Sequence, residues 1–265
     1  MIYTQEQIAR YLERIQYDGP LDVSMDTLNG LIYAHQCQIP FENLDVFDFK
    51  KEIDLDPQSL YRKLVLNERG GYCFETNGLF YGMITSLGFD AYPCMCRVMF
   101  GVEDPADHEI DHRATIVRMD GKKYFCEAGI GAAMPPEALE VAENKWQEMK
   151  GYVYCTRTVE EGWYATVRKT KSGGEKMELL FSLLPVHEID FVRISYALSH
   201  SADSKFCRMR VVNRRTPRGY YDLTDDVFTE EADGKKTVVK LSRDEIPGIL
   251  KEKFHLDISE PLRPL

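Results

Sequence analysis

The sequence predicts an α+β protein in which a helical part precedes a strand-rich part. Apolar residues recur at helical spacing up to about residue 88, and from about residue 90 the period switches to two. From about residue 187 helical and strand patterns mix again. The chain of 265 residues exceeds one average domain. We therefore expect more than one unit, with soft boundaries near residues 88 and 190.

Three helices are predicted before residue 70. Thr4 and Gln7 form a capping-box pattern ahead of apolar residues at helical spacing. A second helix is expected over residues 25–37. The pair Asp56-Pro57, an N-cap followed by proline at the first helical position, opens a third that ends at the Gly-Gly pair after Arg69.

A fourth helix is predicted to begin at Cys73, because residues at helical spacing from it share one face. They are Cys73, Asn77, Phe80, Ile84 and Leu87.

The middle of the chain reads as antiparallel strands, of the kind that closes into a small barrel. The strand candidates cover residues 91–100, 112–119, 122–129, 151–157, 162–169 and 175–184. The last part is expected to hold a helix, three strands and a final helix. The first helix is expected over residues 187–200, and the strands over 207–214, 219–224 and 235–242. Ser242 with Glu245 opens the final helix.

Composition argues against several classes of protein. The net charge of −10 makes a generic nucleic-acid binder a poor interpretation. The longest apolar stretch, residues 78–89, is too short to span a membrane, and the N-terminus has no signal-peptide core. We expect the seven cysteines to be free thiols in a reducing, cytoplasmic setting.

Cys73 is the first candidate for chemistry. The glycine pair allows a turn that delivers Cys73 to a helix start, where free N–H groups and the helix dipole favour the nucleophilic thiolate. Together with His112, considered next, the helix start predicts a pKa below that of an ordinary thiol. The alternative is an ordinary buried thiol.

A nucleophilic cysteine needs a base, and the base needs a group that orients it. His112 starts a strand that runs to Asp120-Gly121, a strong hairpin signal. An even-length loop places Glu127 opposite Ala114, so that Glu127 and His112 become diagonal neighbours about 7–8 Å apart. The alternative for His112 is a solvent-facing strand end.

Other polar residues make weaker candidates. His35 is expected to be a hydrogen-bonded core residue, and His108 to belong to a solvated acidic loop. Asp111 is a rival orienter, but successive strand residues point to opposite faces. Cys94 and Cys96 face one side, with no second cluster at zinc spacing, so no metal is expected.

Four segments together resemble the arylamine N-acetyltransferases over nearly the full length. They are RGGYCFETN at 69–77, IPFENLD at 39–45, DHRATIV at 111–117 and EAGIG at 127–131. The resemblance implies a helical domain over residues 1–88 carrying the nucleophile. It further implies a β-barrel domain over 89–190 carrying the histidine and the glutamate, and an α/β lid domain over 191–265.

The resemblance also implies the chemistry. Cys73, His112 and Glu127 fall on a thiol triad, with glutamate where the family usually has aspartate. Acetyl-CoA is the implied donor. Acetyl passes through an acetyl-cysteine to an arylamine or arylhydrazine, by a ping-pong route typical of xenobiotic metabolism.

The implied substrate contacts are Phe41 and Val98 near the acceptor and Gly129 and Gly131 beside the site. Core packing and a strand-ending bulge are the respective alternatives. The basic run Arg208, Arg210, Arg214, Arg215 and Arg218 either meets CoA phosphates or forms a solvated strand face.

Two other functions stay open. The same triad could serve an acyl hydrolase or an amide synthase that uses another donor, because a slightly opened site at Glu127 would admit water. A non-enzymatic scaffold is the third possibility, against which the intact Cys73, His112 and Glu127 argue. The sequence leaves the oligomeric state undetermined.

Overall fold

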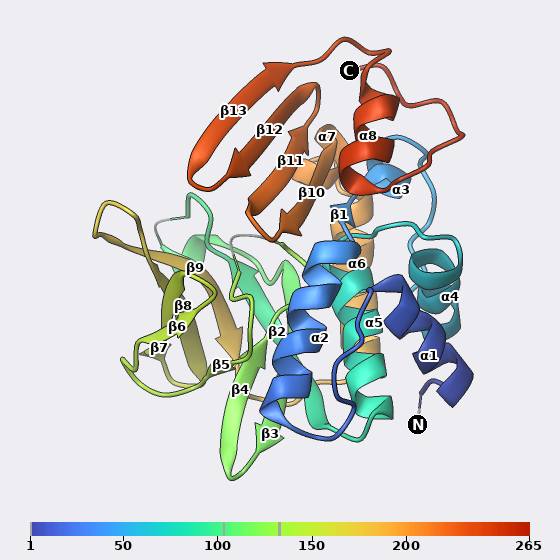
Figure 1. Cartoon of the computed structure of the whole chain (residues 1–265). Coiled ribbons are helices and arrows are strands. Elements are labelled where there is room, and N and C mark those ends of the chain that lie inside the picture. The colour runs from blue at the N-terminus through green and yellow to red at the C-terminus, as the bar shows by residue number, and fades with distance from the viewer. Residues whose placement is uncertain (1, 103, 132–133) are drawn as a thin grey trace.

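The computed structural model describes residues 2–102, 104–131 and 134–265. Figure 1 shows three groups of elements: helices from the first third of the chain, a strongly curved sheet beside them, and a second sheet with a helix above both. The α+β class predicted from the sequence is confirmed.

The helical group is built as its capping signals predict. Helix α1 covers Gln5–Arg14 and α2 covers Met25–Gln38, while α4, Pro57–Tyr61, continues as a π-helical turn over Arg62–Leu66. Thr4 and Gln7 form the expected capping box. The third helix ends at Leu66, earlier than the glycine pair at which it was expected to stop.

Helix α5, Cys73–Ser86, is the central helix of this group. It is buried along nearly its whole length, and residues such as Leu79 and Phe80 pack inside the main core of the helices. A helix that is apolar on every side belongs inside a protein, so α5 is held from all directions and offers a rigid base for Cys73.

The curved sheet has eight antiparallel strands in the order β5-β4-β3-β2-β9-β8-β7-β6. Their bounds are β2 Asp90–Val98, β3 His112–Met119, β4 Lys122–Cys126, β5 Leu139–Glu140, β6 Gln147–Met149, β7 Tyr152–Glu160, β8 Trp163–Lys169 and β9 Glu175–Ser182. The short β5 and β6 were not predicted.

A side chain bridges the two edges of this sheet. The amide of Gln147 in β6 accepts a hydrogen bond from the Glu140 N–H at 3.0 Å and donates one to the Glu140 carbonyl at 3.0 Å. The sheet is thereby a nearly closed barrel, as expected.

The last part of the chain begins with α6, Glu188–His200, and α7, Lys205–Arg208. A five-stranded antiparallel sheet follows in the order β1-β10-β11-β12-β13, closed on one face by α8, Ile246–Phe254. Its strands are β1 Phe41–Glu42, β10 Val211–Thr216, β11 Gly219–Thr224, β12 Val227–Ala232 and β13 Lys235–Lys240.

Strand β1 comes from the helical part of the chain, where it is followed by the short helix α3, Leu44–Phe47. Neither element was predicted, nor was β12. Phe41 pairs with Asn213 of β10, so residues from the first third of the chain complete the last sheet. The units expected at 1–88 and 191–265 therefore share one sheet.

The basic run differs from the solvated strand face considered for it. Residues 205–208 form α7 rather than a strand, because the Ser204 side chain caps a helix there. Arg210, Arg214 and Arg215 are buried and donate hydrogen bonds to Asp48, to the Lys253 carbonyl and to Gln36. A solvated strand face is wrong for these three, since each ties the last sheet to the helices.

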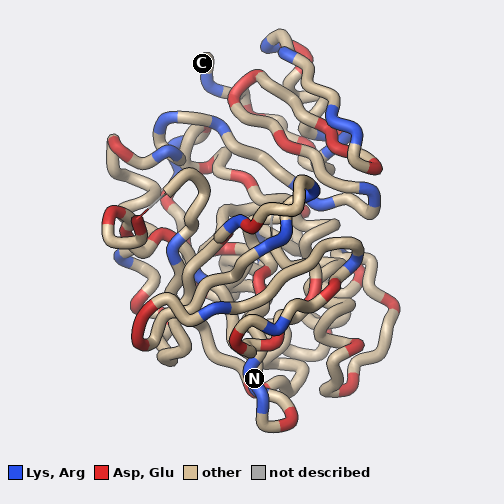
Figure 2. Tube along the Cα trace, turned by 90° about the vertical axis from the view of Figure 1, so that its left-hand side faces the viewer, with Lys and Arg blue, Asp and Glu red and all other residues tan. Residues whose placement is uncertain are grey.

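Among the described residues, no helix is both long and apolar enough to cross a membrane. All seven cysteines are free thiols, as expected. Basic and acidic positions are interspersed along the trace when the molecule is seen from the barrel side (Figure 2).

Candidate active site

Cys73 is the first residue of α5 and is 2% exposed. The Glu75 side chain accepts a hydrogen bond from the Tyr72 N–H at 3.1 Å and so fixes the helix start. The glycines before it serve close approach, because a Cβ at Gly70 would lie 2.3 Å from the Pro40 carbonyl oxygen.

A buried network of charges supports this turn from behind. Lys63 lies 2.7 Å from both Asp45 and Glu75, and Arg69 bonds Glu42 at 2.6 Å and Asp45 at 3.1 Å. Most charged members of the IPFENLD and RGGYCFETN segments thus pair with one another. Their role is to fix the loop before Cys73.

His112 and Glu127 meet as the hairpin alignment predicts. Ile116 pairs with Phe125 across β3 and β4, which is the predicted register. The side chains of His112 and Glu127 are fully buried. His112 Nε2 lies 3.3 Å from Glu127 Oε1. Neither ring nitrogen has a hydrogen-bond partner among the described residues, so the approach to Glu127 is a charge contact, and the Cys73 thiol donates to the Asp111 carbonyl at 3.8 Å.

Glu127 lies directly after β4 and is held by several donors. Its Oε1 accepts hydrogen bonds from the Gly129 N–H at 2.6 Å and from Asn77 Nδ2 at 2.9 Å, and its Oε2 accepts one from the Ile130 N–H at 3.2 Å. These bonds fix the position of the carboxylate. The extra methylene of glutamate is therefore accommodated by the chain after β4.

Asn77 joins the elements that carry the three candidates. It lies one turn after Cys73 on α5, and its Nδ2 also donates to the Arg113 carbonyl at 2.8 Å. Its Oδ1 accepts from the Ala128 N–H at 2.9 Å. Sequence analysis placed Asn77 on the face of Cys73 without assigning it a role. Its four-residue spacing from the cysteine was the available signal.

The electrostatics at Cys73 differ from the expectation. Burial raises the pKa of the Cys73 thiol well above its ordinary value, and the Asp111 and Glu127 carboxylates act in the same direction. Lys205 and the Phe74 N–H lower the pKa, but burial outweighs them. The lowered pKa predicted from the helix start and His112 together is therefore wrong. A thiolate requires a base that takes the proton.

Cys73 and His112 line one cavity of about 210 Å³. Phe41 and Val98, predicted to lie near the acceptor, also line it, as do Lys205 and Phe206. The cavity places a nucleophile and an imidazole within an apolar enclosure that suits an aromatic ring.

Gly129 and Gly131 lie in the chain just after the candidate residue Glu127. A Cβ at Gly129 would lie 2.4 Å from Asn77 Nδ2, and one at Gly131, which has a φ of +91°, would lie 2.4 Å from Asn213 Oδ1. Neither glycine lines the cavity of Cys73. Their geometry supports the turn after Glu127 more directly than it supports substrate contact.

His108 is not simply part of a solvated loop. Its Nε2 lies 3.0 Å from Asp111 Oδ2, while Asp111 Oδ1 accepts from the Val98 N–H at 2.8 Å. Asp111 is thus engaged away from His112. His35 is a buried core residue, as expected, with Nδ1 2.9 Å from the Tyr11 hydroxyl.

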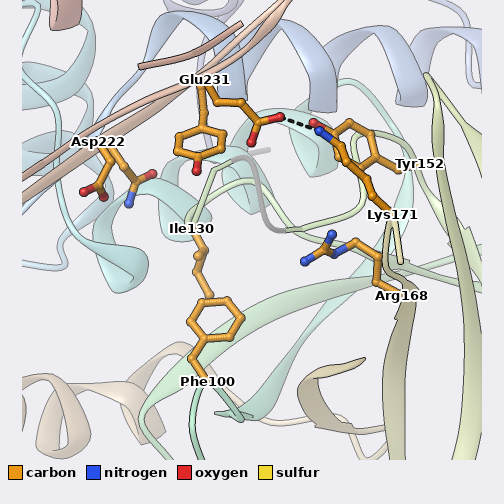
Figure 3. Close-up of a pocket in the computed structure, with 9 residues that line it drawn as sticks. Phe100, Ile130, Tyr152, Arg168, Lys171, Asp222 and Glu231 are labelled. Atoms are coloured by element: carbon orange, nitrogen blue, oxygen red, sulfur yellow. Dashed lines mark hydrogen bonds and ion pairs between the residues drawn. The ribbon is translucent and has the colours of Figure 1, made fainter. Parts of the chain in front are cut away.

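A groove of about 310 Å³ adjoins the cavity and shares Phe100, Ile130, Asn213 and Asp222 with it. Figure 3 shows Asp222 on one side of this groove and Arg168, Lys171 and Tyr152 on the other, with Lys171 paired to Glu231. No cluster of three or more metal-ligating side chains occurs within the described ranges.

Comparisons with known proteins point in one direction. A sequence model of the N-acetyltransferase family matches residues 24–263. The arylamine N-acetyltransferase of Escherichia coli strain K12 is 30% identical over 256 residues, covering 96% of this chain and 90% of that protein.

Solved structures agree with this match. The arylamine N-acetyltransferase of Salmonella typhimurium superposes with a TM-score of 0.89 at 26% identity, covering 97% of this chain and 94% of that one. The enzyme from M. tuberculosis gives a TM-score of 0.88 at 26% identity, covering 95% and 94%.

Proposed function

This chain belongs to the arylamine N-acetyltransferase family of acyltransferases, and from that premise we propose that it carries acetyl from acetyl-CoA to an arylamine or arylhydrazine on Cys73. The observation that carries the proposal is the 3.3 Å approach of His112 Nε2 to Glu127 Oε1 at a cavity that Cys73 also lines.

In the first half-reaction the Cys73 Sγ attacks the thioester carbonyl of acetyl-CoA. His112 Nδ1 takes the thiol proton, and the Glu127 carboxylate accepts the hydrogen bond from Nε2–H and balances the imidazolium charge. The proton then passes to the leaving CoA thiolate. Because burial raises the pKa of Cys73, this base is essential rather than auxiliary.

In the second half-reaction the amine nitrogen attacks the carbonyl of the acetyl-cysteine. His112 takes a proton from that nitrogen, and the thiol of Cys73 is regenerated. Phe41 and Val98 provide apolar contact for the aromatic ring. Donor and acceptor use the same cavity in turn, so a ternary complex is unnecessary.

We place the CoA nucleotide at the open end of the groove. A further hollow of about 360 Å³ there shares Tyr152, Arg168, Lys171 and Glu231 with the groove. Its basic lining residues are Lys150, Arg168, Lys169, Lys171, Arg215 and Arg218, against the single acidic Glu231. Such an excess of positive charge suits phosphate groups.

The acyl hydrolase or amide synthase alternative depended on a loosened site at Glu127. The donors from Gly129, Asn77 and Ile130 hold that carboxylate firmly, so no observation favours the alternative. We further propose that Gly129 and Gly131 act by shaping the turn behind the triad, and that the chain functions in the cytoplasm in xenobiotic metabolism.

Intact-mass spectrometry of enzyme mixed with acetyl-CoA alone tests the proposal. One added acetyl group should appear on the peptide that contains Cys73, and adding an arylamine should discharge it. The Cys207→Ser protein, which lacks a different and partly exposed thiol, is the matched control and should acetylate normally. A kinetic pattern that requires both substrates, with no acetylated enzyme trapped, would contradict the covalent route.

A further inference from the structure

Two polar side chains stand where the catalytic cavity opens into the groove. Asn213 of β10 and Asp222 of β11 are directly paired across their strands. Their neighbours Val212 and Leu223 point into the core under α8, so Asn213 and Asp222 occupy the opposite face of the sheet. Both line the cavity of Cys73 and the groove beside it.

The Oδ1 atom of Asn213 is buried and has no hydrogen-bond partner among the described residues. Leaving such an acceptor unpaired costs about 1–3 kcal/mol in general. Gly131 leaves the space that this oxygen occupies, since any Cβ there would lie 2.4 Å from it. A buried, unpaired acceptor at a catalytic cavity indicates a donor supplied by a ligand.

Asp222 carries charge at the same place. Burial raises the pKa of its carboxyl above the ordinary value. Thr224 donates to Oδ2 at 3.1 Å, and this bond and the charge of Lys236 oppose the effect of burial. Figure 3 shows Asp222 on the side of the groove away from Arg168 and Lys171, so those basic groups do not neutralise it.

Resting on the proposed function, we infer that Asn213 and Asp222 select the acceptor. They receive an N–H or cationic group on the ring of the arylamine, remote from the reacting nitrogen, and they disfavour a carboxylate there. The pantetheine arm of the donor is uncharged, and the phosphates of CoA belong at the basic end of the groove. A carboxylate in the cavity therefore discriminates among acceptors rather than donors.

Lys205 lines the same cavity and carries a positive charge, but its side chain is exposed to solvent. Water screens an exposed charge much more strongly than a partly desolvated one. The other carboxylate that lines the cavity, Asp111, is engaged by the Val98 N–H and by His108. Asp222 is therefore the charge that the remote group of an acceptor meets where the cavity opens.

Three acceptors of nearly equal shape test this: 4-aminobenzamidine, 4-aminobenzamide and 4-aminobenzoate, which are cationic, neutral and anionic. Enzyme is acetylated first with p-nitrophenyl acetate, which carries no CoA, and discharge of the acetyl-cysteine is followed with each acceptor. We expect the ratio of kcat/KM for the amidine over the benzoate to fall at least about tenfold in Asp222→Asn. Asn213→Ala should slow the neutral amide more than aniline, which lacks the remote donor.

Asp257→Asn removes one negative charge at an exposed position paired with Lys251, and it should leave the ratio as in the wild type. An unchanged ratio in Asp222→Asn would overturn the inference while leaving acetyl transfer intact. Failure of Asp222→Asn to accept acetyl from p-nitrophenyl acetate would also overturn it, because Asp222 would then act on Cys73. A wild-type enzyme that never forms acetyl-cysteine would instead refute the proposed function.

Discussion

His112 Nε2 lies 3.3 Å from Glu127 Oε1, although Glu127 stands just beyond the last residue of β4. The carboxylate reaches the ring because the N–H groups of Gly129 and Ile130 fold back onto it. This turn makes a glutamate fit where the family usually has an aspartate.

Replacing Glu127 by glutamine should slow acetylation at least tenfold, a loss of about 1.4 kcal/mol or more in barrier terms. Glutamine keeps the size but removes the charge that balances the imidazolium. Glu127→Asp keeps the charge but shortens the side chain. Any loss of acetylation rate in this variant measures how closely the turn fits glutamate. The check is the rate of p-nitrophenolate release from p-nitrophenyl acetate. Equal rates in wild type and Glu127→Gln would remove Glu127 from the triad.

Cys73→Ser should abolish acetyl transfer and leave the fold intact. Serine is nearly isosteric, but its hydroxyl is a far poorer nucleophile than a thiol paired with imidazole. Loss of rate should exceed a hundredfold, with an unchanged circular dichroism spectrum and thermal midpoint. Activity of more than a few per cent in the purified variant would exclude Cys73 as nucleophile.

The pH dependence of alkylation should depend on His112. Burial raises the pKa of the Cys73 thiol, and Lys205 and the Phe74 N–H offset that rise only in part. Transfer of the thiol proton to His112 is the remaining way to form the thiolate. In His112→Gln the inflection should therefore lie above the ordinary thiol value of about 8.5. Alkylation by iodoacetamide would then be slow at neutral pH and recover as pH increases.

Wild type should show its inflection at lower pH than His112→Gln. In Glu127→Gln the direction of the pKa shift distinguishes two effects. The negative charge of Glu127 directly raises the pKa of Cys73. By stabilising the imidazolium of His112, the same charge lowers the pKa of Cys73. An upward shift in this variant shows that the imidazolium route dominates. A downward shift would mean that no ion pair forms.

Gly129→Ala should destabilise the protein and reduce activity. The new Cβ would lie 2.4 Å from Asn77 Nδ2 and 2.6 Å from Thr76 Oγ1, so the clamp between α5 and the chain after β4 must shift. Overpacking of this kind costs about 1–3 kcal/mol. Urea denaturation measures the loss.

Gly248→Ala is the matched control, because nothing lies within 4 Å of the added Cβ and the residue sits inside α8. Alanine there should stabilise by up to about 1 kcal/mol through helix propensity. Similar effects of the two substitutions would contradict the steric account of Gly129.

Local sequence signals predicted much of the fold and the approach of Glu127 to His112. Asp120 and Gly121 both have positive φ, so the Asp-Gly pair forms the tight turn that its chemistry favours. That turn fixes the register, and the register brings Glu127 to His112. The N-caps at Thr4 and Asp56 likewise needed only neighbouring residues.

Features that depend on distant partners escaped prediction. Strand β1 has two residues and exists only because β10 pairs with it. The buried Arg215 donates a hydrogen bond to the Gln36 side chain. Spacing along the chain does not reveal a partner so distant in sequence. The pKa of Cys73 was misjudged for the same reason, since the burial that raises it comes from elements far apart in sequence.

The pairing of β1 with β10 has a consequence for synthesis on the ribosome. Phe41 and Asn213 are neighbours in that pairing and both line the cavity of Cys73, although most of the chain separates them in sequence. The nascent chain therefore carries Cys73 for most of its translation without the wall that encloses it. The cavity around this thiol can close only after β10 has left the exit tunnel.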